Sequence, residues 1–261
     1  MKFAERLGAL LTSVVDYSIV PLLLLGSIAL ARVLQQLGVP NFFVTPLIVG
    51  PCAGLIAILE RARPEKLEHQ ALDLPLWQEA AHFIFNFEFG YGLSLCATEL
   101  FERVMRVAVP RTLWPAHWPL ALQLLLAAVL YEATSYWQHR FVHRVPALWR
   151  FHALHHSGAR LNFVRAARFH FVDIGTAAFA SYIPLAFLHA PDSLVTLLAV
   201  MLSLAGMLQH ANIRMRSPAW LDRLICTPAA RPWMPGPRCS PCAGCSTRPA
   251  ATARACRLRP S

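Results

Sequence analysis

The chain is built largely from long apolar runs, and this feature restricts what it can fold into more than any other. Apolar runs that we expect to form membrane helices occupy residues 17–37, 42–59, 83–100, 114–137, 171–188 and 194–208. Only 15% of the 261 residues are charged and 56% are hydrophobic, whereas roughly a quarter of the residues in a soluble chain are charged. The sequence therefore excludes a water-soluble globule and predicts an all-α integral membrane bundle of four to six spans.

Short polar connections join the first two runs and the last two runs, which predicts two helical hairpins. The third run is less apolar because Glu88 and Glu99 interrupt it. Two interpretations of this run remain open, a membrane span or a helix that lies in the interface. The first run begins only near residue 17, and we interpret it as a retained helix and not as a cleaved signal.

The formal charge of +10 is spread unevenly along the chain. Residues 139–170 hold six Arg, six His and no acidic residue, and residues 229–261 hold six Arg and no acidic residue. No polar segment has the basic and aromatic stripe that single-stranded nucleic acid requires, so nucleic acid is excluded as a partner. Because basic loops tend to stay in the cytoplasm, residues 139–170 are predicted to lie on the cytoplasmic face.

Histidine spacing within this basic segment predicts a metal site. His139 and His143 are one helical turn apart directly after the fourth apolar run. Nine residues later, His152, His155 and His156 fall on a single helix face. Imidazole suits zinc, copper, iron and nickel, and a set with more histidines than one ion needs indicates two ions. The alternative interpretation is a solvated polar helix face.

Two more histidines are expected at the same membrane face, because the second hairpin starts and ends there. His170 begins the fifth run and His210 ends the sixth. The other histidines lack such spacing and are interpreted as surface or interface residues: His69, His82, His117 and His189. The predicted metal ligands are His139, His143, His152, His155, His156, His170 and His210.

Motifs around these histidines resemble a known family. They read YWQHR at 136–140, LWRFH at 148–152, HHS at 155–157, RFH at 168–170 and HAN at 210–212. Together they resemble the fatty acid hydroxylase or sterol desaturase superfamily of membrane non-haem di-iron oxygenases. The resemblance covers about a third of the chain, between residues 132 and 228, and the N-terminal half adds only hydrophobic runs.

The resemblance implies a fold, a cofactor and a reaction. It implies a cap of cytoplasmic His-rich helices over the membrane spans, with two iron ions that use O2 to hydroxylate or desaturate a lipid. Electrons would come from a separate ferredoxin- or cytochrome-type donor, because no flavin or nicotinamide motif is visible. The expected location is a bacterial inner membrane, with the histidines on the cytoplasmic face.

Two polar residues are expected to support the ligands. Glu132 lies seven residues before His139 inside the fourth run, where an acidic group is costly and usually has a partner. We expect it to orient a ligating imidazole, and the alternative is an interfacial carboxylate that reaches water. Asn212 is expected to orient His210 or a metal-bound water, with helix capping as the alternative.

The sequence departs from the family pattern after residue 228. The positions of an expected third histidine cluster hold Arg231, Met234 and Pro235, none of which can replace an imidazole. A change of reading frame and true divergence both remain open as explanations, and we expect residues 229–261 to lack a packed core. The predicted organisation is therefore residues 1–112 as N-terminal spans, residues 113–228 as the catalytic domain and residues 229–261 as a tail.

Two functions follow from this pattern. The first is an iron-dependent lipid oxygenase, impaired in this chain by the loss of the third cluster. The second is a non-catalytic membrane protein that binds lipid or metal through an incomplete set of histidines. The lipid and the choice between hydroxylation and desaturation remain open at this point.

Overall fold

The chain forms an all-helical bundle, without a β-strand, in the residues that its structure describes. The structure is a computed structural model that describes residues 2–70, 74–108, 113–157 and 162–218. The predicted tail, with Arg231, Met234 and Pro235, lies outside these residues. The helices are α1 (Lys2–Gln36), α2 (Asn41–Ala62), α3 (Leu76–Ala108), α4 (Leu120–Val142), α5 (Pro146–His152), α6 (Phe171–Phe187) and α7 (Asp192–His210), with 3₁₀ turns at Leu67–His69 and Phe163–Ala167.

Four described helices are long and apolar enough to cross a membrane, which confirms the predicted membrane bundle. They are residues Thr12–Gln36 of α1, and the whole of α2, α4 and α7. The fifth apolar run forms α6, which has 17 residues and is shorter than these four. The third run forms part of α3, a helix of 33 residues that is about 50 Å long at 1.5 Å per residue.

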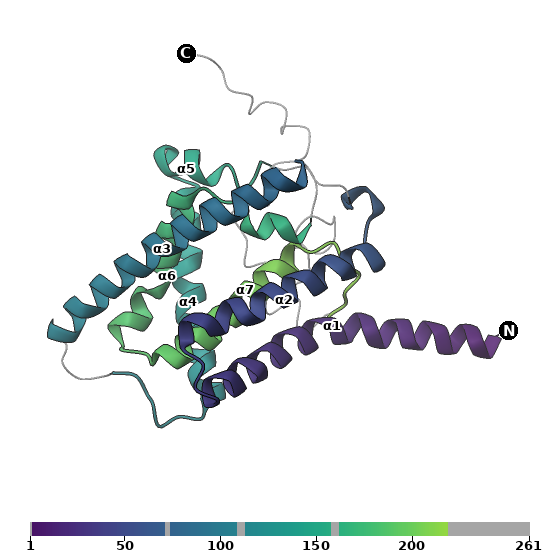
Figure 1. The fold of residues 1–261 in the computed structure, drawn as a ribbon, viewed down its shortest axis with the longest axis horizontal. Helices are drawn as coiled ribbons and strands as arrows, with labels where there is room; N and C mark the ends of the chain where they lie inside the picture. The colour runs from purple at the N-terminus through teal and green to yellow at the C-terminus, as the bar shows by residue number, and fades with distance from the viewer. Residues whose placement is uncertain (1, 71–73, 109–112, 158–161, 219–261) are drawn as a thin grey trace, which may run out of the picture. The chain divides into compact units, whose positions relative to one another are not determined.

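A glycine turn closes the hairpin between α1 and α2, which lie side by side in Figure 1. The N–H of Val39 donates to the carbonyl of Leu34 and the N–H of Gly38 donates to the carbonyl of Gln35, both at 3.0 Å. This is the Schellman pattern, which needs a left-handed residue after the helix. Gly38 supplies it with φ of 81°, and Pro40 then starts the next helix.

The hairpin between α6 and α7 closes in the same way, but without a glycine. The N–H of Ala190 donates to the carbonyl of Leu185 at 2.9 Å. His189 occupies the left-handed position with φ of 55°, a conformation that is costly for a residue with a Cβ atom. Pro191 follows and is the N-cap of α7.

Helix α7 holds the bundle together because it belongs to both hydrophobic clusters. One cluster joins α1, α2 and α7, and includes Ala31, Ile48 and Leu204. The other joins α4, α6 and α7, and includes Leu185 and Leu198. In α7, 39% of the apolar window is buried, against at most 22% in the other three candidate spans. The N-terminal hairpin and the C-terminal helices therefore form one bundle around α7.

Both hairpin turns lie at one end of the bundle, which we call the turn end. The side-chain amide of Gln35 donates to the carbonyl of Ser193 at 2.8 Å, which joins the end of α1 to the start of α7. Trp114, six residues before α4, packs in the same cluster as Ala190 and Leu194. Helix α4 therefore starts at the turn end and runs away from it.

The chain must cross the bundle between α2 and α4, and α3 makes this crossing. Helix α2 ends away from the turn end, where Pro64 forms an antiparallel bridge with Ile213 just after α7. Helix α3 begins at that opposite end, because Glu79 in its first turn lies 3.8 Å from Arg168, which precedes α6. Helices α3 and α6 then run side by side in one direction (Figure 1). Their aromatic contacts are Phe85 with Phe171 and Phe101 with Phe179.

Candidate metal centre

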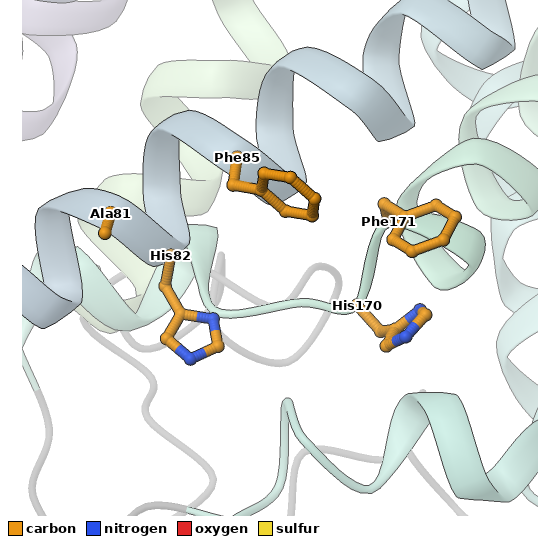
Figure 2. A pocket seen from close by; sticks show the side chains of 5 residues that line it. All are labelled: Ala81, His82, Phe85, His170 and Phe171. Atoms are coloured by element: carbon orange, nitrogen blue, oxygen red, sulfur yellow. The ribbon is translucent and has the colours of Figure 1, made fainter.

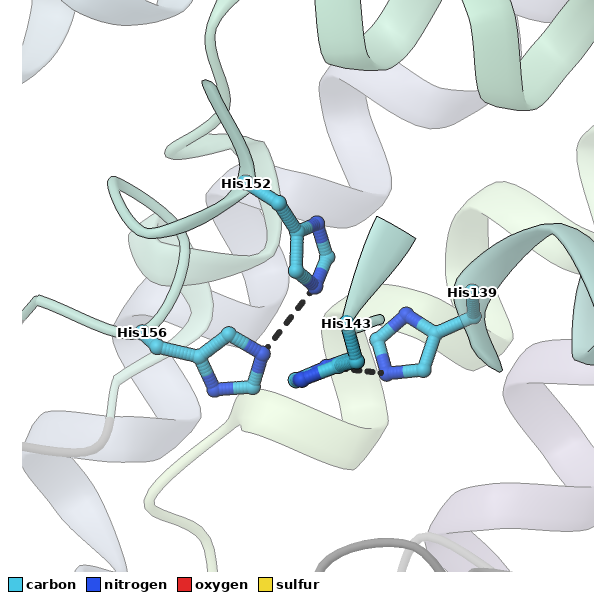
Figure 3. A group of neighbouring side chains, drawn as sticks. All are labelled: His139, His143, His152 and His156. Carbon is cyan, nitrogen blue, oxygen red and sulfur yellow. Dashed lines mark hydrogen bonds between the residues drawn. The ribbon is translucent and has the colours of Figure 1, made fainter. Parts of the chain in front are cut away.

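Four histidines converge at the end of the bundle opposite the turns (Figure 3). Each offers one ring nitrogen, and these four nitrogens all lie within 4.8 Å of one another. The Nε2 atoms of His139 and His143 are 3.1 Å apart, and the Nε2 atoms of His152 and His156 are also 3.1 Å apart. We call these residues the four-histidine group.

Two helices and the bend between them bring this group together. Helix α4 carries His139 in its last turn and has His143 as its C-cap one turn later, so both rings leave the same face. Val145 is extended and Pro146 opens α5 at the first helical position, where proline is well tolerated. The short α5 then returns its last residue, His152, to within 4.7 Å of the His139 ring, measured between ring centroids.

A second pair of histidines adjoins the group. The ring centroid of His155 lies 5.2 Å from that of His156 and 5.5 Å from that of His210. The ring of Phe169 stacks on His155 with an interplanar angle of 8°. Nδ1 of His210 lies 2.9 Å from the carbonyl of Gly206, so it donates there and leaves Nε2 as the ligating nitrogen. The structure thus brings six of the seven predicted ligands together.

The seventh predicted ligand, His170, lies apart from the other six. It caps α6, where its Nδ1 accepts from the N–H of Val172 at 3.2 Å. Its ring packs against Phe151 and Phe171. Among the described residues, no hydrogen bond or ring contact joins His170 to the other predicted ligands.

His170 instead lines a largely apolar pocket beside α3 (Figure 2). The pocket has a volume of about 320 Å³. Its other polar ring is His82, whose position in the sequence predicted only a surface or interface residue. The lining residues are Ala81, His82, Phe85, His170 and Phe171.

Sequence reasoning missed the acidic residue that supports the four-histidine group. Nδ1 of His152 lies 2.8 Å from Oδ2 of Asp173, and the two side chains are 3% and 4% exposed. A carboxylate only accepts, so Nδ1 carries the hydrogen and Nε2 is left to bind a metal. The sequence did contain a signal, because Asp173 is an acidic residue within the fifth apolar run.

The two residues expected to support the ligands lie in other surroundings. Among the described residues, no hydrogen bond or ion pair joins Glu132 to a histidine. The side chain of Asn212 is occupied by the backbone of Lys66: Oδ1 accepts from its N–H at 3.0 Å and Nδ2 donates to its carbonyl at 2.8 Å. Asn212 therefore attaches the segment after α7 to the segment after α2.

The surroundings favour the neutral, metal-binding form of three histidines outside the spans, His143, His155 and His156. Burial, followed by the nearby imidazoles of His152 and His143, lowers the pKa of His156 to about 4. Burial, followed by the imidazole of His210, lowers the pKa of His155 to about 2. Burial also lowers the pKa of His143.

The donor set fits a transition metal. Neutral imidazole nitrogens suit iron, zinc, copper and nickel. Two nitrogens that each bind one ion at about 2.1 Å, with a right angle between the two metal–nitrogen bonds, lie roughly 3 Å apart. The two 3.1 Å separations within the four-histidine group match this spacing. Nδ1 of His155 is buried without a hydrogen-bond partner among the described residues, which is costly unless another group binds it.

Comparison with known proteins agrees with the motifs and the geometry. Residues 124–232 match the fatty acid hydroxylase family, and the chain belongs to the fatty acid hydroxylase superfamily. The ornithine lipid hydroxylase OlsE of Rhizobium tropici is 34% identical over 187 residues, which make up 69% of this chain and 55% of that protein. The chain thus spans about half the length of this curated relative. No solved structure matches it.

Proposed function

We propose that this chain is a membrane-bound, iron-dependent oxygenase that hydroxylates a lipid with O2. The observation that carries this proposal is the convergence of six histidines at the ends of α4, α5 and α7. Such a centre lies beside an apolar helical bundle, where a lipid is the substrate within reach. The family and the hydroxylase relative support hydroxylation over desaturation.

The histidines divide naturally between two ions. The four-histidine group would hold one iron, and His155 with His210 would provide nitrogens for the second. Bound iron would supply the activation of O2 for attack on a C–H bond. The protein would contribute the ligand geometry: Asp173 sets the orientation of His152, and Phe169 restricts the ring of His155 by stacking.

We further propose that the substrate is a lipid with an amino-acid headgroup, of the class named for the relative. Support comes from the 34% identity with an ornithine lipid hydroxylase. The pocket of Figure 2 offers an apolar site close to the centre, because His170 in its wall contacts Phe151, the neighbour of His152. This pocket would bind part of the acyl chain.

The remaining parts of the proposal concern the domain, the electron source and the membrane face. Residues 113–228 would form the catalytic domain. A separate ferredoxin- or cytochrome-type protein would deliver electrons, and the basic segment 139–170 would face the cytoplasm from a bacterial inner membrane. Activity would be reduced in this chain because Arg231, Met234 and Pro235 replace the third histidine cluster.

The test is to purify the chain in lipid nanodiscs and measure its iron content and its product. Supplied with reductant, O2 and ornithine lipid, it should add one oxygen atom, seen as a gain of about 16 mass units, at a low rate. Removal of two ligands, His139→Ala with His156→Ala, should remove the iron of the four-histidine group and abolish product. Product formation by this double variant would contradict the proposal.

A further inference from the structure

Glu60 connects two distant segments of the chain at the end of the bundle opposite the turns. It lies two residues before the end of α2, in the N-terminal hairpin, outside the residues that match the hydroxylase family. One oxygen atom of its carboxylate, Oε1, accepts two backbone hydrogen bonds. The N–H of Asn212 donates to it at 2.7 Å and the N–H of Phe163 donates to it at 2.8 Å.

One of these segments leads directly to a histidine of the metal centre, and the other leads to a phenylalanine whose ring stacks on one. Asn212 is two residues after His210. Phe163 opens the 3₁₀ turn before Phe169, whose ring stacks on His155 at a centroid distance of 4.1 Å. His155 and His210 themselves meet at 5.5 Å. The two backbone segments that bind Glu60 therefore come together again where His155 and His210 are in contact.

The two hydrogen bonds to Glu60 are suited to setting the separation of His155 and His210. A hydrogen bond to an ionised carboxylate is stronger than one between neutral groups, and a single oxygen atom that accepts two N–H groups holds both at a defined spacing. Asn212 also binds the backbone of Lys66, which attaches the segment after His210 to the same hairpin. The bonds to Glu60 differ from those between Asn212 and Lys66, because Glu60 also joins the segment after His210 to the segment that begins at Phe163.

We propose that Glu60 is a positioning residue of the metal centre, which sets the separation of His155 and His210 by binding the backbone of Asn212 and of Phe163. The proposal rests on the metal centre of the proposed function. It extends the functional part of the chain to α2, outside residues 124–232 that match the fatty acid hydroxylase family.

The test is a double-mutant cycle on the affinity for Co²⁺, measured by ligand-field absorption of the full chain in nanodiscs. Glu60→Leu removes both acceptor bonds and should weaken Co²⁺ binding about tenfold or more and shift the ligand-field bands, in the range seen when a group that supports a ligand is lost. Glu60→Gln keeps an acceptor oxygen and should stay within about threefold of the unchanged chain. In a His210→Ala chain, the effect of Glu60→Leu should largely disappear, because coupled residues are not additive.

A second pair of variants addresses the backbone bond without changing Glu60. Phe163→Pro removes the N–H donor at the first position of the 3₁₀ turn, where proline is tolerated. Asn162 before it is already extended, with ψ of 163°, as a residue before proline should be. Phe163→Pro should weaken Co²⁺ binding more than Phe163→Ala does.

The matched control is Asp16→Asn. Asp16 is a buried acidic residue near the same end of the same hairpin, and it pairs with Arg63 at 2.6 Å. This variant should lower thermal stability while leaving Co²⁺ affinity and the absorption bands unchanged.

Several outcomes would overturn the proposal. They are unchanged Co²⁺ binding in both Glu60→Leu and Phe163→Pro, an equal loss in Asp16→Asn, and an undiminished effect of Glu60→Leu in the His210→Ala chain. If the unchanged chain binds no Co²⁺, the metal centre itself fails, and the role of Glu60 fails with it.

Discussion

Nδ1 of His152 and Oδ2 of Asp173 lie 2.8 Å apart in a buried pair that links α5 to the first turn of α6. This contact leaves only Nε2 of His152 for the metal. Asp173→Asn keeps the size of the side chain but removes its charge and lets an N–H group face the ring. We expect it to weaken metal binding about 10- to 100-fold, as measured by Co²⁺ titration.

Asp192→Asn is the matched control for Asp173→Asn. Asp192 lies in the first turn of α7 as Asp173 lies in the first turn of α6, but it is exposed and at the turn end. Its replacement should leave the metal affinity unchanged. Equal affinities in the two variants would show that the carboxylate of Asp173 does not orient a ligand.

The position of His170 in the pocket gives a second prediction. His170→Asn keeps an acceptor at the N-cap of α6, a position that favours Asn, and removes the imidazole. Because His170 lies apart from the six other histidines, metal affinity should stay within about threefold, while KM for the lipid rises. A tenfold or greater loss of metal affinity would instead restore His170 as a ligand, the role that its sequence position suggested.

The path of α3 predicts the membrane topology. Reporter fusions after residues 117 and 189, both near the turn end, should report the same face. Fusions after residues 70 and 157 should report the other face, which the positive-inside tendency makes the cytoplasmic one. If α3 lay in the interface instead, the fusions after residues 70 and 117 would report the same face.

Gly38 provides a prediction about stability. Its φ of 81° is in the left-handed region, and a Cβ atom there would meet no other atom within 4 Å. Gly38→Ala should therefore lower the free energy of unfolding by about 1 kcal/mol through backbone conformation alone. Gly26→Ala, in the middle of α1 with equally open surroundings, should raise it by up to about 1 kcal/mol. Denaturant titration in detergent measures both, and equal signs would contradict the argument.

The last prediction concerns the positions of the missing cluster. A third set of imidazoles, introduced as Arg231→His, Met234→His and Pro235→His, should raise bound iron from fewer than two to two per chain and increase turnover. The replacement also removes the positive charge of Arg231, which disfavours a nearby cation by on the order of 4 kcal/mol at about 4 Å and an effective dielectric near 20. Two iron equivalents in the unchanged chain would show that the three residues are not needed.

Contacts between residues close in the sequence could be predicted, whereas contacts between distant residues could not. His139 and His143 could be paired from the sequence because helical periodicity alone places them together. The helices themselves were predictable because apolar runs of this length have few alternatives in a membrane. The contacts of His152 with Asp173, 21 residues away, and of Glu60 with Asn212, 152 residues away, depend on how the helices pack, and no periodicity encodes that.

Asn212 shows that closeness in the sequence does not by itself predict a contact between side chains. Its sequence position, two residues after His210, favoured a role toward that histidine. The structure shows its amide bonded to the backbone of Lys66 instead, because the chain turns after α7 and brings the two segments together. Proximity in sequence was a weaker guide here than the direction of the chain after the helix end.

The placement of the histidines at helix ends has a consequence for biogenesis. The two hydrophobic clusters lie in α1, α2, α4, α6, α7 and the segments beside them at the turn end, and they include none of the six convergent histidines. Insertion and assembly of the bundle are therefore expected not to depend on the proposed iron. A newly made chain can be integrated by the translocation machinery first and receive its metal afterwards, so iron starvation should leave a stock of inserted, inactive protein that recovers without new synthesis when iron returns.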